Sequence, residues 1–185
     1  MDINLFYFTG ALRDGSIDFR ERKNYELRIY QDDERFLLNI KKILRKMFRT
    51  KVRIKNNLLR MNGKNTIKRI IELTGFKSPQ VFWDTPEFIK KGNRKQIWYY
   101  VGGFFDAEGG VPKKTNGQKY ISFDQKNKDC LIFIRDFLLK EGFNPTNLTN
   151  TGKVWQFRLT RKKEIKKFYI NLISFHSKKR VGFVK

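Results

Sequence analysis

Two stretches of the chain are almost continuously apolar. Residues 3 to 13 and residues 97 to 107 each contain mostly hydrophobic side chains, and each is followed by an acid and a glycine. The acids are Asp14 and Glu108. Because apolar runs of this length exceed a typical strand, they predict two buried helices that end at acidic residues.

After each predicted helix, apolar and polar residues alternate with the period of a β-strand. In the first case the apolar positions lie on both sides of a polar turn, which predicts a β-hairpin; they are Ile17, Phe19, Leu27 and Ile29. After the second helix, Val111 and residues 120 to 124 repeat the pattern around a longer turn.

The next segment indicates a duplication. Residues 33 to 48 carry apolar side chains at helical spacing, and adding 94 to each number aligns them with a second segment. Gln31 falls on Gln125, and Asp14 falls on Glu108. The aligned apolar pairs are Leu37 and Leu131, Leu38 and Ile132, Ile40 and Ile134, Ile43 and Phe137, and Leu44 and Leu138. Chance similarity between amphipathic helices is the alternative, but the coincident polar positions favour a repeat.

Residues 58 to 67 also correspond to residues 156 to 165, so each half follows the order helix, strand, strand, helix, strand, strand, helix. The fold class is therefore α+β with two pseudo-symmetric halves. We expect an N-terminal half at 1–76, a linker at 77–95 and a C-terminal half at 96–185. The linker is rich in turn-forming residues: Pro79, Pro86 and Gly92.

The amino-acid composition narrows the choice of binding partner. The formal net charge is +23, while 39% of residues are hydrophobic and 15% are aromatic, so the chain has enough apolar side chains to fold. A folded polycation favours an anionic polymer or an anionic membrane surface. Because the basic residues run through nearly every segment, nucleic acid is the better expectation.

No apolar run approaches the roughly 20 residues of a membrane span, and no signal-peptide pattern opens the sequence, so we expect an intracellular protein. The cytoplasm or nucleoid of a prokaryote is favoured, with an organelle as the alternative. With a single cysteine, Cys130, and a single histidine, His176, the sequence has no zinc-binding cluster. Any metal is expected to be held by oxygen.

The segment Val101–Gly109 resembles, letter by letter, the nine-residue signature of the LAGLIDADG homing endonucleases, with Gly103 at a small-residue position and Glu108 at the catalytic acid. The N-terminal copy, Tyr7–Gly15, is degenerate but keeps its acid and final glycine. The resemblance is to monomeric, two-motif members of the archaeal intron-encoded type. It implies two αββαββα halves that form a saddle-shaped antiparallel sheet surface over paired signature helices.

The resemblance also implies a metal site. Asp14 and Glu108 are the expected metal-binding and catalytic pair, with Mg²⁺ as the ion, since Mg²⁺ prefers oxygen ligands. Mn²⁺ is expected to substitute, and Ca²⁺ to support binding without cleavage. Gln31, Gln125 and Lys126 match the family's polar positions that organise water and transition-state charge; solvated strand ends are the alternative. Asp106 is expected to be structural.

Strand alternation predicts the DNA-binding face, because side chains next to the buried Leu27 and Ile29 point the other way. Such a mixed polar set is suited to reading base edges in the major groove, although ordinary solvated faces are the alternative for each residue. The expected DNA-binding residues are Ser16, Asp18, Arg20, Glu26, Arg28, Tyr30, Arg53, Lys55, Lys113, Lys114, Ser122, Asp124, Gln156 and Arg158.

The leading hypothesis is a monomeric, site-specific homing endonuclease that cuts double-stranded DNA at a long asymmetric target. The alternative on the same scaffold is an intron RNA maturase or a DNA-binding regulator without nuclease activity, which makes intron RNA a second candidate partner. A structural RNA-binding protein would explain the charge but not the duplicated acid-ended helices.

Overall fold

The computed structural model describes residues 1–19, 25–111 and 119–181 of the chain. Its first half contains one four-stranded antiparallel sheet in the order β1-β2-β4-β3. The elements are α1 (Ile3–Ala11), a 3₁₀ turn (Leu12–Asp14), β1 (Gly15–Asp18), β2 (Glu26–Tyr30), α2 (Glu34–Phe48), β3 (Arg53–Lys55), β4 (Leu58–Asn62) and α3 (Lys64–Thr74). This is the predicted order of elements.

The second half repeats this order with a sheet β5-β6-β8-β7, so the predicted α+β fold with two related halves is confirmed. A connecting segment comes first, with a 3₁₀ turn (Gln80–Phe82) and α4 (Glu87–Lys90). Then follow α5 (Arg94–Glu108), β5 (Gly109–Gly110), β6 (Ile121–Gln125), α6 (Lys128–Lys140), β7 (Thr149–Asn150), β8 (Trp155–Leu159), α7 (Lys162–Asn171) and α8 (Ser177–Val181).

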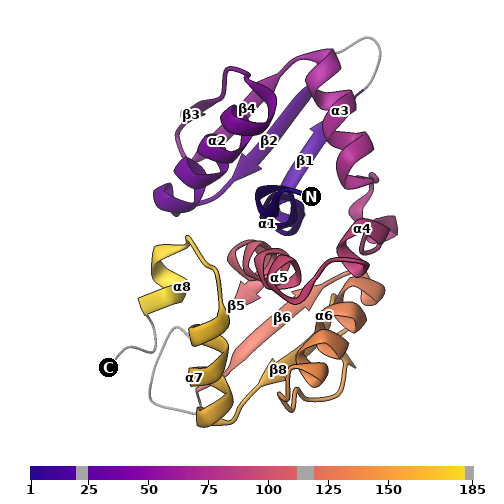
Figure 1. The fold of residues 1–185 in the computed structure, drawn as a ribbon, viewed down its shortest axis with the longest axis vertical. Coiled ribbons are helices and arrows are strands. Elements are labelled where there is room, and N and C mark those ends of the chain that lie inside the picture. Colours follow the sequence, from indigo (N-terminus) through magenta and orange to yellow (C-terminus); the bar gives the residue numbers. More distant parts are fainter. Residues whose placement is uncertain (20–24, 112–118, 182–185) are drawn as a thin grey trace.

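Helices α1 and α5 lie side by side at the centre of the molecule, and Figure 1 looks nearly along both of them. The N-terminal half lies on one side of the pair and the C-terminal half on the other. Each half has its own hydrophobic core, and Tyr99 of α5 packs against both. Among the described residues, no helix is long and apolar enough to cross a membrane.

The two central helices are in backbone contact. A Cβ atom on Gly10 would lie 2.2 Å from the carbonyl oxygen of Tyr100, and one on Gly103 would lie 2.0 Å from that of Tyr7. Small residues therefore allow the approach, as the signature implies for Gly103. In α1, Gly10 serves this contact, whereas the hydroxyl of Thr9, the residue at the signature's glycine position, donates to the carbonyl of Leu5 at 2.7 Å.

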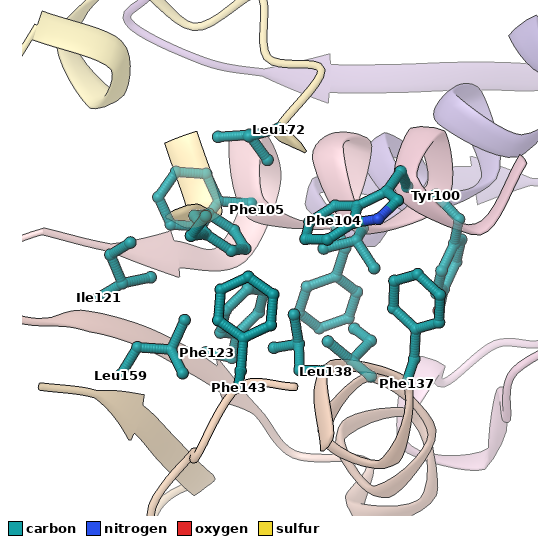
Figure 2. Close-up of a cluster of buried hydrophobic side chains, with 14 of the residues drawn as sticks. Tyr100, Phe104, Phe105, Ile121, Phe123, Phe137, Leu138, Phe143, Leu159 and Leu172 are labelled. Atoms are coloured by element: carbon teal, nitrogen blue, oxygen red, sulfur yellow. The ribbon is translucent and has the colours of Figure 1, made fainter. Parts of the chain in front are cut away.

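The C-terminal core is built largely from phenylalanine. Phe105 of α5, Phe123 of β6 and Phe143 surround a common apolar interior in Figure 2. Phe123 stacks on Phe157 of the neighbouring strand at 4.9 Å between ring centroids, and Phe168 of α7 meets Phe105 edge to face at 5.3 Å. These contacts fix β6 and β8 against α5, so the end of α5 is held relative to the sheet.

The strand faces follow the predicted alternation. Leu27 and Ile29 are fully buried against the helices, while Arg28 and Tyr30 are exposed on the other face. Pairing of β2 with β1 and β4 extends this division across the sheet. The domain boundaries at 76 and 96 stay a prediction; α5 itself begins at Arg94, capped by the side chain of Asn93.

We expect Gly103→Ala to destabilise the fold. Alanine in a helix interior is normally about 1 kcal/mol better than glycine, but here the added methyl would overlap the Tyr7 carbonyl, and such overpacking costs about 1–3 kcal/mol. Thermal unfolding should therefore show a lower melting temperature. Lys95→Ala, at an exposed position of the same helix, is the control and should not lower it; an increase for Gly103→Ala would contradict the backbone contact.

Candidate active site and DNA interface

The two central helices end at carboxylates. A 3₁₀ turn carries α1 to Asp14, and α5 ends at Glu108. A glycine follows each acid, and both glycines have extended backbone, with φ of −104° at Gly15 and −71° at Gly109. Space is the reason for glycine, since a Cβ on Gly109 would lie 2.1 Å from the ring of Phe105.

Each carboxylate is held by a glutamine at the end of a central strand. The side-chain amide of Gln31, after β2, donates to Asp14 at 3.0 Å, and that of Gln125, in β6, donates to Glu108 at 3.2 Å. The two pairs are equivalent under the 94-residue repeat. Sequence reasoning grouped these four residues, and the structure brings them together.

Burial perturbs both acids, and the charge of Glu108 also acts on Asp14. The pKa of Asp14 rises from its usual 3.8 to about 7, first because burial disfavours its charge and second because the Glu108 carboxylate is near. The pKa of Glu108 is also raised, mainly by burial. Two half-buried carboxylates that oppose each other's ionisation form a site at which a cation would relieve the repulsion.

The donor set fits a divalent ion that prefers oxygen. Among the residues that the structure describes, no group of three or more His, Cys, Asp or Glu side chains forms a metal site. Asp14 and Glu108 would therefore supply two carboxylates, and solvent and phosphate oxygens would supply the remaining ligands. This is the usual manner of binding for Mg²⁺.

The strand ends differ in charge between the halves. Lys126 follows Gln125 and has an exposed side chain, while its backbone N–H donates to the Gln125 side-chain oxygen at 2.7 Å. At the equivalent place Asp32 accepts a hydrogen bond from Asn57 at 3.1 Å. The surroundings of the two carboxylates are therefore unequal.

Asp106 is structural, as expected. It is fully buried and accepts hydrogen bonds from the hydroxyl of Tyr7 at 2.5 Å, the hydroxyl of Ser174 at 2.5 Å and the backbone N–H of Phe175 at 2.7 Å. These contacts join α5 to α1 and to the segment before α8. These hydrogen bonds of Asp106 therefore hold the packed segments together.

Two cations near the carboxylates were missed by sequence reasoning. Arg13 is 97% buried, stacks over Trp83 at 4.1 Å and donates to the Trp83 carbonyl at 2.6 Å. Lys179 of α8 donates to backbone carbonyls at the end of α5. Both lower the pKa of Glu108 against the effect of burial. Arg13 was visible only as a departure from the signature, and nothing in the pattern around Lys179 pointed to the site.

The predicted DNA-binding residues of the first sheet lie on one face. Cross-strand pairing aligns Ser16 of β1 with Arg28 of β2, and Arg28 with Arg60 of β4. Arg60 is in turn aligned with Arg53 of β3. Asp18, Tyr30 and Lys55 extend the same face. Arg60 was missed, although the alternation of β4 places it there. Together these residues give this face a strongly basic character.

Glu26 was predicted to be an outward DNA contact, but only 7% of its surface is exposed. Its carboxylate accepts a hydrogen bond from Nε of Arg28 at 2.5 Å and lies 3.8 Å from Nε of Arg60. This acid orients two arginines, so the expectation of an open base-reading acid was wrong. The reason is that its long basic neighbours fold over it.

The second sheet carries a connected polar network. The hydroxyl of Ser122 donates to Asp124 at 2.7 Å, Gln156 donates to the same carboxylate, and Arg158 donates to Gln156 at 2.7 Å. Arg158 also lies over the ring of Tyr120 at 4.6 Å. Ser122 is only 5% exposed, so the expectation that it is open to DNA was wrong, because Asp124 covers its hydroxyl.

The remaining predicted contacts, Arg20, Lys113 and Lys114, lie outside the described residues. The described residues lie on the sheet faces predicted for them, but the side chains of Glu26 and Ser122 are covered there.

The arrangement defines a class of protein: two related α+β halves, joined by closely packed helices, that present a pair of carboxylates beside polar sheet faces. A family model described as a LAGLIDADG-like domain matches residues 95–172. The homing endonuclease I-ApeI of Aeropyrum pernix is 29% identical, over 89% of this chain and 78% of the relative. The C-terminal half thus matches a LAGLIDADG-like domain, and the chain as a whole is similar to a homing endonuclease.

Solved structures agree on the fold. Mesophilic variants of the homing endonuclease I-DmoI share it with a TM-score of 0.69 at 14% identity, over 96% of this chain and 95% of theirs. I-DmoI in complex with DNA and Ca has a TM-score of 0.66 at 15% identity, over 92% of this chain and 88% of that one. I-WcaI bound to its DNA recognition sequence has a TM-score of 0.62 at 13% identity, over 92% of this chain and 80% of that one.

We expect the acid pair to make the metal-free fold less stable as pH rises. An unfolded Asp titrates near pH 4, whereas Asp14 in the folded chain titrates at about pH 7, so the folded state holds the extra proton between these values. The free energy of unfolding should therefore fall from pH 4 to pH 7. Asp14→Asn should reduce this slope to the part that Glu108, whose pKa is also raised, contributes. It should also raise the melting temperature at pH 8 in chelator by about 2–4 °C or more; for a chain of this length, 2–4 °C corresponds to about 1 kcal/mol.

The gain should be absent at about pH 3, below the pKa of an unfolded Asp, where Asp14 is mostly protonated in both states. Asp129→Asn, at an exposed position, removes the same charge and should not reproduce it. If Asp14→Asn is no more stable than the parent at pH 8, the two carboxylates do not repel each other as described.

Proposed function

We propose that this protein is a site-specific endonuclease that hydrolyses a phosphodiester bond in each strand of double-stranded DNA. The observation that carries the proposal is the pairing of Asp14 and Glu108 at adjacent helix ends, each bound by a strand-end glutamine. A protein that only binds nucleic acid has no use for two half-buried carboxylates held close together. The homing endonucleases found by the comparisons support this reading.

The DNA would lie across the two sheets. Their outer faces combine arginines with amide, hydroxyl and carboxylate groups, which suits both phosphate contact and base reading. The net charge of +23 favours association with a polyanion. Because the two faces differ in chemistry, the favoured target is long and asymmetric, bound by a single copy of the chain.

Mg²⁺ is the proposed ion, with Asp14 and Glu108 as its protein ligands. When bound, such an ion neutralises charge that develops on the phosphate during hydrolysis. Mn²⁺ is proposed to substitute and Ca²⁺ to support binding without cleavage. The solved neighbours include complexes of I-DmoI with DNA and Ca and with DNA and Mn.

The surrounding side chains would orient the reactants. Gln31 and Gln125 each donate one amide hydrogen to a carboxylate, and the amide of each has further hydrogen-bonding capacity for a water molecule. Lys126 is exposed beside Gln125 and would place a positive charge near the phosphate undergoing attack. Asp32 has no such effect, so we propose unequal cleavage of the two strands.

The halves at 1–76 and 96–185 would each contact one side of the target, and the linker at 77–95 would set their spacing. An intracellular location fits this role. Intron RNA is retained as a further candidate partner, but the maturase and regulator alternatives are not favoured, because both acids and both glutamines are in place.

We expect Asp14→Asn and Glu108→Gln each to reduce double-strand cleavage by at least about a hundredfold, because each removes one of the two charged metal ligands. DNA affinity in Ca²⁺ should change far less. Cleavage of a plasmid carrying the intronless target, in Mg²⁺, measures the first quantity, and a mobility-shift titration measures the second.

Asp129→Asn is the matched control, since it removes an exposed carboxylate from the start of α6. It should cut at the parent rate. Parent-like cleavage by either site variant would refute the assignment of the acid pair, and binding without cleavage by the parent protein would favour the regulator alternative.

Binding should depend steeply on salt. If about 6–10 phosphates are contacted, DNA affinity should fall by roughly 10³ to 10⁵ between 50 and 200 mM salt, because bound protein releases counterions. Arg60→Ala should flatten the slope of log affinity against log salt, whereas Lys95→Ala, on α5, should not. A slope near zero for the parent protein would contradict DNA binding by charge.

A further inference from the structure

The chain continues past α7 into a segment, residues 172–181, that we call the C-terminal strap. It lies between the halves, and Figure 1 shows its helix α8 on the side of the molecule opposite α4 and the linker. Asp106 of α5 accepts from Ser174 and Phe175, and Asp33 accepts from the backbone N–H of Ser177 at 3.0 Å. The strap thus binds one buried acid from each half.

The strap also packs tightly along α5. A Cβ atom on Gly102 would lie 2.0 Å from the carbonyl oxygen of Ile173, so backbone meets backbone there as well. Phe175 meets Tyr7 edge to face at 5.1 Å, and Tyr169 donates to the carbonyl of Lys179 at 2.9 Å. These contacts fix the position of α8 relative to α1 and α5.

The linker makes the corresponding contacts on the other side. Asp33 caps α2, and Asn127, 94 residues later, caps α6. Asp33 holds the strap, and Asn127 holds the linker by donating to the carbonyl of Val81 at 2.8 Å and to Asp84 at 2.8 Å. The two segments therefore occupy pseudo-symmetric places.

Each segment sends one side chain to the end of a central helix. From the linker, the amide of Gln80 donates to the carbonyls of Leu12 and Gly15, on either side of Asp14. From the strap, Nζ of Lys179 donates to the carbonyls of Phe105 at 2.9 Å and Asp106 at 2.8 Å, with that of Ala107 at 3.3 Å. Under the 94-residue repeat the carbonyl of Leu12 corresponds to that of Asp106, but the donor to one is neutral and the donor to the other is charged.

Three carbonyls satisfy all three hydrogens of the ammonium group, so Lys179 has no donor left for DNA. Its charge acts instead on the helix terminus. The last carbonyls of a helix carry partial negative charge, and here they immediately precede the Glu108 carboxylate. A fixed cation at this point offsets the helix dipole and prevents the last turn of α5 from loosening under the repulsion of the acid pair.

We propose that Lys179 is a positioning residue for the cleavage reaction, which holds the last turn of α5, and with it Glu108, in place for metal and DNA. The inference rests on the proposed endonuclease function. It assigns the strap a role in the active site in addition to its packing role, although no strap side chain is proposed to touch the reacting atoms.

The test compares three substitutions. Lys179→Gln keeps a donor that can reach a helix carbonyl, as Gln80 does in the other half, but removes the charge; Lys179→Arg keeps the charge; and Lys178→Gln removes the same charge from the exposed neighbour in α8. Turnover and KM are measured in Mg²⁺ on the target DNA, DNA affinity in Ca²⁺, and the melting temperature in chelator.

We expect Lys179→Gln to lower kcat by about tenfold to a hundredfold, the usual effect of a small misplacement of a reacting group. KM and DNA affinity should stay within about twofold of the parent, which a loss of fold would not produce. Lys179→Arg should recover most of the turnover, and Lys178→Gln should cut at the parent rate. Parent-like turnover by Lys179→Gln would overturn the inference.

A second readout needs no cleavage. In metal-free protein labelled with ¹³C in glutamate, the carboxyl resonance of Glu108 is assigned by its absence in Glu108→Gln. Lys179→Gln should move this resonance and Lys178→Gln should not; equal spectra would overturn the inference even if turnover fell. If the parent protein does not cleave, the proposed function fails, whereas the resonance still reports on whether Lys179 positions Glu108.

Discussion

The backbone contact between α1 and α5 is the constraint on which the rest of the structure depends. Gly10 and Gly103 let the two helices touch without side chains between them, and this contact decides how far apart their ends can be. Each half has its own core, apart from Phe6 of α1, which belongs to the C-terminal core, so the helix contact sets the register between the halves. The distance between the two acids is therefore a property of helix packing and not of the loops that follow.

Bringing two acids together has an electrostatic cost, and buried cations partly offset it. Arg13, held by the linker, and Lys179, held by the C-terminal strap, both act on Glu108. They come from opposite sides of the helix pair. The linker and the strap thus stabilise a charge arrangement that the two repeated halves alone would leave strained.

The repeat made most of the fold predictable. A single offset of 94 aligned helices, acids and glutamines, and the same offset relates the helix caps Asp33 and Asn127. The alternation of apolar and polar residues predicted the strand faces correctly, but it does not show how long side chains bend over their neighbours. That is why Glu26 was expected to be open, although its arginine neighbours cover it.

Lys179 could not be predicted for a different reason. It lies more than 70 residues from the carbonyls it binds, in a lysine-rich stretch with no distinguishing pattern. Only the folding of the strap against α5 selects it from its neighbours. Likewise the sequence shows a glycine after each acid, but only the structure shows that crowding by Phe105 is the reason for Gly109.

The hydrogen-bonded row on the second sheet bears on fidelity. Ser122, Asp124, Gln156 and Arg158 already satisfy one another before any ligand arrives, and Tyr120 supports the guanidinium. A row locked in this way loses little rotamer freedom when a duplex docks, but it also adapts poorly to a wrong base pair. A mismatch under this row would leave several linked groups without partners at once, so tolerance to changes in the bound DNA sequence should be lower there than under the arginines of the first sheet.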